Sequence, residues 1–152
     1  LVVALLGMAC AAQPARPQAI DTRSDPCSSC RMVISDLSFA AQIVAPGEEP
    51  RFFDDLGCLR DYLAANALPG KSSIYVADHR THSWIETSRA FFTSLPTAHS
   101  PMGSHFAAYA DERSWKADPN ATAGTPVSVR DVLGIAAAGV QGGQGREGGN
   151  RP

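Results

Sequence analysis

The stretch Cys27-Ser-Ser-Cys30-Arg-Met32 places two thiols and a thioether close together, directly before the first long apolar run. A Cys-x-x-Cys pair is compatible with a redox dithiol, half of a zinc site or a disulfide. Thiolate and thioether are both soft ligands and favour Cu(I), whereas zinc sites are built from Cys, His and carboxylate. Met32 therefore shifts the interpretation towards copper. The alternative is a structural disulfide between Cys27 and Cys30 beside a methionine that packs in the core.

A third thiol, Cys58, lies near the start of a predicted helix whose N-cap is Asp54 or Asp55. Helix N-termini lower the pKa of a thiol, because their unpaired amides and dipole stabilise the thiolate. Cys58 is therefore a candidate for a third sulfur ligand. The alternative is a buried structural cysteine, since cysteine is among the most buried residue types.

A further thioether occurs in the second half of the chain. Met102 stands between Pro101 and Gly103, which predicts a turn rather than a buried strand, and His105 follows three residues later. We expect Met102 and a thiolate of Cys27 or Cys30 to bind one Cu(I), with His105 helping. Packing of Met102 in the core is the alternative.

The N-terminal residues are typical of an exported protein. Residues 1–9 are apolar and resemble the end of a signal-peptide core whose start is missing. A cysteine at the junction predicts lipidation at Cys10, with cleavage after Ala11 or Ala12 as the alternative. Residues 10–26 contain three prolines and show no periodicity, which predicts a flexible tether. We expect a periplasmic protein held at the membrane by its lipid.

Charge and hydropathy argue against a nucleic-acid partner and against a membrane-spanning segment. The net charge is -2, and the basic residues are scattered singly, so we expect no nucleic-acid partner. No apolar run reaches the roughly 18 residues that a membrane span requires. Membrane attachment is therefore expected through the lipid alone.

Short apolar segments and two helical patterns predict an α+β fold. Helical periodicity covers 55–67, with Pro69-Gly70 as its stop, and 127–138, with Ser128 as a possible N-cap and Gly139 at its end. A short helix and loop are expected over 111–123. The predicted strands are 32–35, 39–45, 51–54, 73–77, 83–86, 90–94 and 106–110.

Similar sequence blocks recur in the same order in the two halves. The first half contains Met32, Phe39-Ala-Ala41 and Leu59-Arg-Asp-Tyr-Leu63; the second contains Met102, Phe106-Ala-Ala108 and Val129-Arg-Asp-Val-Leu133. This predicts two related small units, each an antiparallel sheet with one helix, at 27–95 and 96–140. Residues 141–152 are predicted to be a disordered tail. Under this duplication, Met32 and Met102 occupy related places.

Taken together, the motifs resemble the NosL family of copper-binding lipoproteins associated with the maturation of nitrous oxide reductase. The segments that carry the resemblance are Cys27-x-x-Cys30-x-Met32, Phe53-Asp-Asp-Leu-Gly-Cys58-Leu, Tyr75-Val-x-Asp78 followed by Trp84-Ile, and Ser100-Pro-Met102-Gly. The resemblance implies two α+β units similar to a small domain of organomercurial lyase. It also implies Cu(I) delivery to a periplasmic copper enzyme, with nitrous oxide reductase the suspected client. The family's ligand roles carry over to a cysteine of the first motif and to Met102, and His105 fits chemically.

The function expected from these observations is a metallochaperone, which performs no bond chemistry and is not an enzyme. One alternative is a thiol-disulfide oxidoreductase that uses Cys27 and Cys30. Such enzymes usually place the motif at a helix N-terminus, whereas here it precedes a predicted strand. The other alternative is a non-enzymatic lipoprotein stabilised by a disulfide between the same two cysteines.

Overall fold

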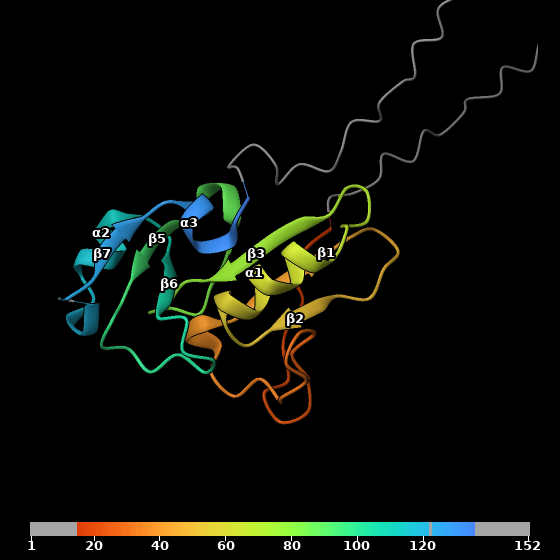
Figure 1. The fold of residues 1–152 in the computed structure, drawn as a ribbon, viewed down its shortest axis with the longest axis horizontal. Coiled ribbons are helices and arrows are strands. Elements are labelled where there is room, and N and C mark those ends of the chain that lie inside the picture. Colours follow the sequence, from red (N-terminus) through yellow and green to blue (C-terminus); the bar gives the residue numbers. More distant parts are fainter. Residues whose placement is uncertain (1–14, 122, 136–152) are drawn as a thin grey trace, which may run out of the picture.

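The computed structural model describes residues 15–121 and 123–135, which form two antiparallel sheets with helices packed against them (Figure 1). This confirms the predicted α+β class. The first sheet has the order β2-β1-β3-β4, and the second has the order β6-β5-β7. The strands are β1 (Ala41–Val44), β2 (Arg51–Phe53), β3 (Ser73–Ala77), β4 (Trp84–Glu86), β5 (Phe91–Ser94), β6 (Phe106–Tyr109) and β7 (Thr125–Val127).

Helix α1 (Leu56–Ala65) packs against the first sheet, and α3 (Val129–Leu133) packs against α1 (Figure 1). The side chain of Asp55 caps α1, and Leu56 and Leu59, one turn apart, bury the same face in the core. Helix α2 (Glu112–Lys116) follows β6. Short 3-10 helices occupy η1 (Leu37–Phe39), η2 (Thr87–Arg89) and η3 (Pro119–Ala121).

The two sheets are built on one topology. In each, two successive strands are followed by a helix and a third strand, as β1-β2-α1-β3 and β5-β6-α2-β7, and the first strand of each set lies between the other two. Two related small units are therefore confirmed.

The correspondence predicted from the repeated blocks is wrong in detail. Phe39-Ala-Ala41 leads into the central strand β1, whereas Phe106-Ala-Ala108 lies in the edge strand β6. Helix α1 precedes the third strand of its unit, whereas α3 follows the third strand of the other. Met32 lies before β1 and Met102 lies between β5 and β6, so these two methionines are not equivalent.

Three predicted boundaries also change. Strand β5, expected in the first unit, pairs with β6 and β7, so the division between the units lies before β5. The last helix ends at Gly134, whose φ of +70° is the left-handed conformation that terminates helices, rather than at Gly139 outside the described residues. The predicted strand 32–35 is reduced to a single bridge between Val33 and Pro26.

Strand β7 was missed because Thr125-Pro-Val127 contains a proline. The strand lies at the edge of its sheet, where a proline need not donate to a neighbour. Ser128, which follows β7, caps α3 as expected, in a reciprocal arrangement with Asp131.

Residues 15–26 of the predicted tether are ordered, and its residues 10–14 lie outside the described residues. The side chain of Gln42, a fully buried residue of β1, accepts from the Gln18 amide at 2.8 Å and donates to the Gln18 carbonyl at 3.0 Å. The Tyr75 hydroxyl donates to the Ala15 carbonyl at 3.2 Å. A buried side-chain amide needs hydrogen-bond partners, and the N-terminal segment supplies them to Gln42. The prediction of a flexible tether, made from composition alone, is therefore wrong for these residues.

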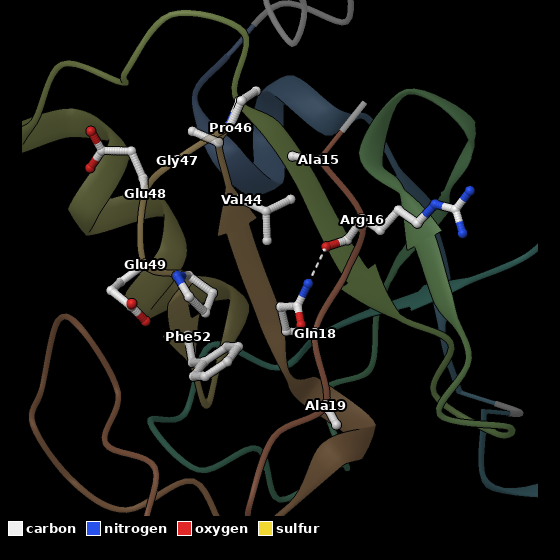
Figure 2. Close-up of a pocket in the computed structure, with 12 residues that line it drawn as sticks. Ala15, Arg16, Gln18, Ala19, Val44, Pro46, Gly47, Glu48, Glu49 and Phe52 are labelled. Atoms are coloured by element: carbon white, nitrogen blue, oxygen red, sulfur yellow. Dashed lines mark hydrogen bonds between the residues drawn. The ribbon is translucent and has the colours of Figure 1, made fainter. Parts of the chain in front are cut away.

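Figure 2 shows this N-terminal segment running beside β1, with a groove of about 580 Å³ between it and the loop that joins β1 to β2. Glu48 and Glu49 line the loop side of the groove, and Arg16 lies on the segment side. None of Cys27, Cys30 and Cys58, the cysteines in the described part of the chain, lines the groove. In the described part of the chain, no helix has the length and apolar character needed to cross a bilayer.

Candidate metal centre

The Cys-x-x-Cys motif lies on a small hairpin over residues 25–34. The Ile34 amide donates to the Asp25 carbonyl at 3.0 Å, and the Cys27 amide donates to the Met32 carbonyl at 2.8 Å. Arg31, with a φ of +68°, donates its amide to the Cys27 carbonyl at 3.0 Å and reverses the chain. This turn is tight enough to bring the two thiols to one side of the hairpin.

The hairpin is attached to β2 by a hydrogen bond of 2.7 Å from the Ser28 amide to the Phe52 carbonyl. Asp54 follows the end of β2, and Cys58 is the third residue of α1. Sγ atoms of three cysteines and a carboxylate oxygen consequently meet, all within 4.8 Å of one another. We call this group the thiol–carboxylate cluster; its members are Cys27, Cys30, Asp54 and Cys58.

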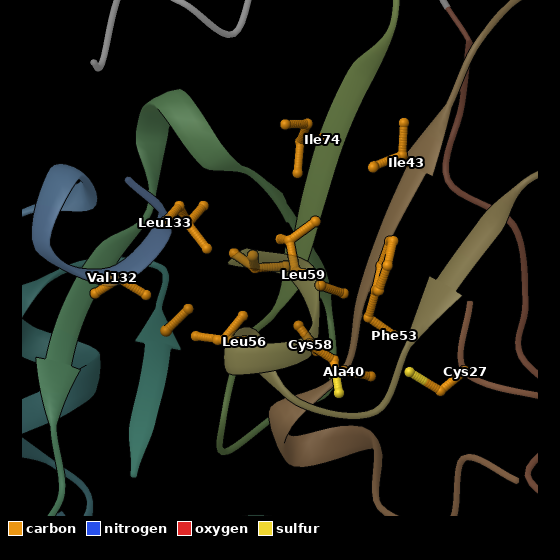
Figure 3. Packing of buried hydrophobic residues seen from close by; sticks show 14 of the residues in the cluster. Cys27, Ala40, Ile43, Phe53, Leu56, Cys58, Leu59, Ile74, Val132 and Leu133 are labelled. Atoms are coloured by element: carbon orange, nitrogen blue, oxygen red, sulfur yellow. The ribbon is translucent and has the colours of Figure 1, made fainter. Parts of the chain in front are cut away.

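The thiol–carboxylate cluster forms the edge of the main apolar core. Cys27 and Cys58 both belong to that core, and Figure 3 shows their sulfur atoms turned towards each other beside Phe53. Cys27, Asp54 and Cys58 are buried, whereas Cys30 is partly exposed. Cys30 is therefore the member through which solvent, or an ion, reaches the cluster.

Burial affects the pKa of two of the thiols, Cys27 and Cys58. It raises the pKa of Cys27, and it also raises the pKa of Cys58, with further increases from the neighbouring Cys27 and Asp54. The expectation that the helix N-terminus lowers the pKa of Cys58 is therefore wrong, because desolvation and negative neighbours outweigh the dipole. All three cysteines are free thiols in this structure.

The two candidate methionine ligands, Met32 and Met102, lie on the surface. Met32 is 57 % exposed and Met102 is 47 % exposed, so neither is a core residue, and the alternative of core packing fails for both. The Met102 amide donates to the Asp55 carboxylate at 3.0 Å. This bond places the loop that carries Met102 at the N-terminus of α1, against Asp55, which directly follows Asp54 of the thiol–carboxylate cluster.

His105 lies outside the thiol–carboxylate cluster, which is the one group of His, Cys and carboxylate side chains in 15–121 and 123–135 whose atoms could share an ion. Its Nδ1 lies 2.8 Å from the Ala98 carbonyl, so the proton resides on Nδ1 and the lone pair on Nε2. Its backbone has a φ of +58°. A ligand role for His105, through Nε2, stays a prediction.

Asp54 is the cluster member that sequence reasoning missed as a ligand. Two consecutive aspartates precede α1, and either could have served as its N-cap. Asp55 takes that role by accepting from the Gly57 amide at 2.6 Å, which leaves Asp54 facing the thiols. Both Asp54 carboxylate oxygens lie 3.6 Å from the Cys30 Sγ. The sequence did contain a signal for this role, namely a second aspartate directly beside the one that caps the helix.

No curated protein matches this chain. The sequence model of the NosL family matches residues 17–134. The matched region contains both sheets, all four members of the thiol–carboxylate cluster, and the loop with Met102 and His105. The match covers most of the chain and agrees with the resemblance of the four motifs. The chain therefore belongs to the NosL family.

Proposed function

We propose that this protein binds Cu(I) through the thiols of Cys27, Cys30 and Cys58 and carries the ion to a copper enzyme. The observation that supports this most is the convergence of three free thiols within 4.8 Å. Sulfur donors select Cu(I) over hard divalent ions. The NosL family membership points to the same metal.

The geometry suits a carrier, which must bind tightly and still release its ion. Cys30 is the accessible thiol. The exposed thioether of Met32 lies two residues away on the same hairpin, and the exposed Met102 lies on the loop whose amide is hydrogen-bonded to Asp55, the residue after Asp54. We propose Met102 as an additional ligand, with His105 helping through Nε2. Since burial raises the pKa of the Cys27 and Cys58 thiols, copper must displace their protons, and its apparent affinity should fall in acid.

An oxidoreductase function is less well supported. Catalytic cysteines need a lowered pKa and an accessible sulfur. Cys27 is fully buried and its pKa is raised, and the hairpin that carries it leads into no α-helix. We therefore propose a carrier that performs no bond chemistry.

The client and the location rest on the family and on the N-terminal sequence. We propose nitrous oxide reductase as the first client to test, and a periplasmic protein anchored by a lipid on Cys10, which lies outside the described residues. Replacing Cys10 with Ala should move the protein from the membrane to the soluble periplasmic fraction. An unchanged membrane fraction would contradict the anchor.

Anaerobic titration of the reduced protein with Cu(I), against a competing chelator, tests copper binding directly. We expect one Cu(I) per monomer. Serine at Cys27, Cys30 or Cys58 should lower the affinity by at least about tenfold, since even partners outside the ligand shell contribute that much. Ser29→Ala is the control, since it changes an exposed residue of the same hairpin without removing a thiol, and it should bind as the parent does. Parent-like binding by all three cluster variants would refute the proposal.

A further inference from the structure

Strand β4 leaves one edge of the first sheet open. It is the outermost strand in the order β2-β1-β3-β4, and among residues 15–121 and 123–135 no other strand pairs with its outer side. Open edges can pair with other extended chains, and proteins usually protect them by lysine, by proline or by shortness. Strand β4 is short, but Trp84-Ile-Glu86 contains neither lysine nor proline.

The pairing with β3 determines which backbone groups of β4 face outwards. The Asp78 amide donates to the Ser83 carbonyl at 2.8 Å, so the backbone of Ser83 faces β3. In an antiparallel pair, the residues that bond to the neighbouring strand alternate. The register continues with Ala77 opposite Trp84, so the amide and carbonyl of Trp84 and the amide of Glu86 point away from β3. No hydrogen bond to these three groups forms within the described part of the chain.

A pocket of about 500 Å³ opens beside this edge. It is lined by β4, by Tyr75 of β3, by Arg89 of η2 and by Ala110, which follows β6. Because side chains alternate along a strand, Trp84 and Glu86 share the face of the sheet that carries Tyr75. Trp84 is only partly buried, and neither Glu86 nor Arg89 forms an ion pair with another described residue. The pocket therefore combines open main-chain groups with an aromatic surface and two charges.

We propose that the β4 edge binds an extended segment of a partner protein, which adds a strand antiparallel to β4. Open main-chain donors and acceptors fit an extended backbone, whereas the main-chain groups of a helix bond to one another. Antiparallel pairing lets one residue of the segment exchange two hydrogen bonds with Trp84. The inference concerns partner recognition, and it requires no metal and no copper function.

The pocket also indicates which side chains the segment carries. The residue opposite Trp84 turns its side chain onto the indole, where an apolar group fits. The residue two positions earlier lies opposite Glu86, where a basic group fits. Arg89 follows in η2, so an acidic group two positions earlier still completes the pattern acidic-x-basic-x-apolar.

The test uses the peptide Glu-Thr-Lys-Thr-Val, acetylated and amidated at its ends, and reduced, metal-free, isotope-labelled full-length chain. In an NMR titration the peptide should shift the amide signals of Trp84 and Glu86 and the indole signal of Trp84. The same peptide with an N-methylated valine lacks the donor to the Trp84 carbonyl. It should bind about two- to tenfold more weakly, as expected for one hydrogen bond.

Glu86→Pro removes the outward amide from the protein side. The φ of Glu86 is -62°, which proline adopts without strain, and proline is tolerated on an edge strand because no ladder bond is lost. Stability in urea should therefore match that of the parent, while peptide affinity should fall by about tenfold or more. Glu86→Gln is the matched control, because it keeps the amide and removes the charge, and it should weaken binding less than proline does.

Three results would overturn the inference. The first is the absence of shifts at millimolar peptide. The second is binding that neither N-methylation nor Glu86→Pro weakens, which would show that no strand is added. The third is a parent that sediments as a dimer and becomes a monomer in Glu86→Pro, which would assign the edge to a second copy of this chain. Copper titration is independent of all three, so failure of the proposed copper function would leave this inference standing.

Discussion

Asp55 fastens the loop of Met102 to the helix that carries Cys58, so its replacement is an informative perturbation. One carboxylate oxygen accepts from the Gly57 amide at 2.6 Å, and the other accepts from the Met102 amide at 3.0 Å. Burial acts to raise the pKa of Asp55, but hydrogen bonds from Ser104, Gly57, Met102 and Ser100 together outweigh it and hold the pKa below its usual value.

The expected loss in the free energy of unfolding follows from these hydrogen bonds. Asp55→Asn keeps an oxygen for the Gly57 amide but turns an NH₂ group towards the Met102 amide, so one charge-assisted bond is lost and two donors face each other. Such a bond contributes about 1.5–3 kcal/mol, and we expect the free energy of unfolding to fall by about 2–4 kcal/mol at pH 7. At roughly 4 °C per kcal/mol for a domain of this size, Tm should fall by about 8–16 °C.

The same argument gives a pH dependence. Because the pKa of Asp55 is lowered on folding, its stabilisation is fully present above the unfolded pKa of about 3.9 and is lost as the pH falls through the folded value. The difference between parent and variant should therefore shrink as the pH is lowered below about 3.9.

Urea unfolding of reduced, metal-free protein at pH 7 and at pH 3 measures both effects. Asp61→Asn, an exposed change on the same helix, should shift stability by less than about 0.5 kcal/mol. A loss in Asp55→Asn no larger than that of this control, or an equal loss at both pH values, would refute the reasoning.

Three further predictions concern other contacts. Met102→Leu should lower Cu(I) affinity by at least about tenfold in the chelator titration while changing stability by less than about 0.5 kcal/mol, because the residue is half exposed; parent-like copper binding would exclude it as a ligand. Tyr109→Phe deletes a buried hydroxyl that donates to Asp118 at 2.9 Å, so urea unfolding should show a loss of about 1.5–3 kcal/mol, and a change below about 0.5 kcal/mol would contradict this. Gln42→Leu removes both hydrogen bonds to Gln18, so amide exchange and proteolysis should accelerate within residues 15–26; unchanged protection would show that other contacts hold this segment.

The local elements could be predicted where the apolar pattern is regular. The strand predicted at 73–77 is β3, and the helix predicted at 55–67 contains α1, because period and capping residues act over a few neighbouring positions. The pairing of the strands could not be predicted in the same way. The sequence predicts a strand at 90–94 but does not say that Phe91 lies opposite Tyr109, so β5 was placed in the wrong unit.

The three cysteines of the candidate site were predicted, but Asp54 and the arrangement of the cluster were not. The three cysteines follow from soft-metal chemistry, whereas their convergence depends on the hydrogen bond from Ser28 to Phe52, which no motif encodes. The direction of the Cys58 pKa shift was missed for the same reason, since desolvation depends on packing between distant segments. The internal repeat gave the wrong correspondence between the strands and helices of the two units, because short shared triplets do not specify which strand lies at the centre of a sheet.

Two members of the thiol–carboxylate cluster lie at or on regular secondary structure and two lie on a hairpin, and this division would bear on the proposed metal transfer. Asp54 lies just after the end of β2, and Cys58 lies on α1, whose Leu56 and Leu59 belong to the main apolar core. Cys27 and Cys30 lie on the hairpin over 25–34, which is attached to β2 through the Ser28 amide. Local opening is expected first in segments outside regular secondary structure, and the hairpin, which carries the accessible thiol of Cys30, is such a segment. A client that takes an ion from this cluster would therefore meet Cys30 first, and the hairpin rather than α1 is the element that would move.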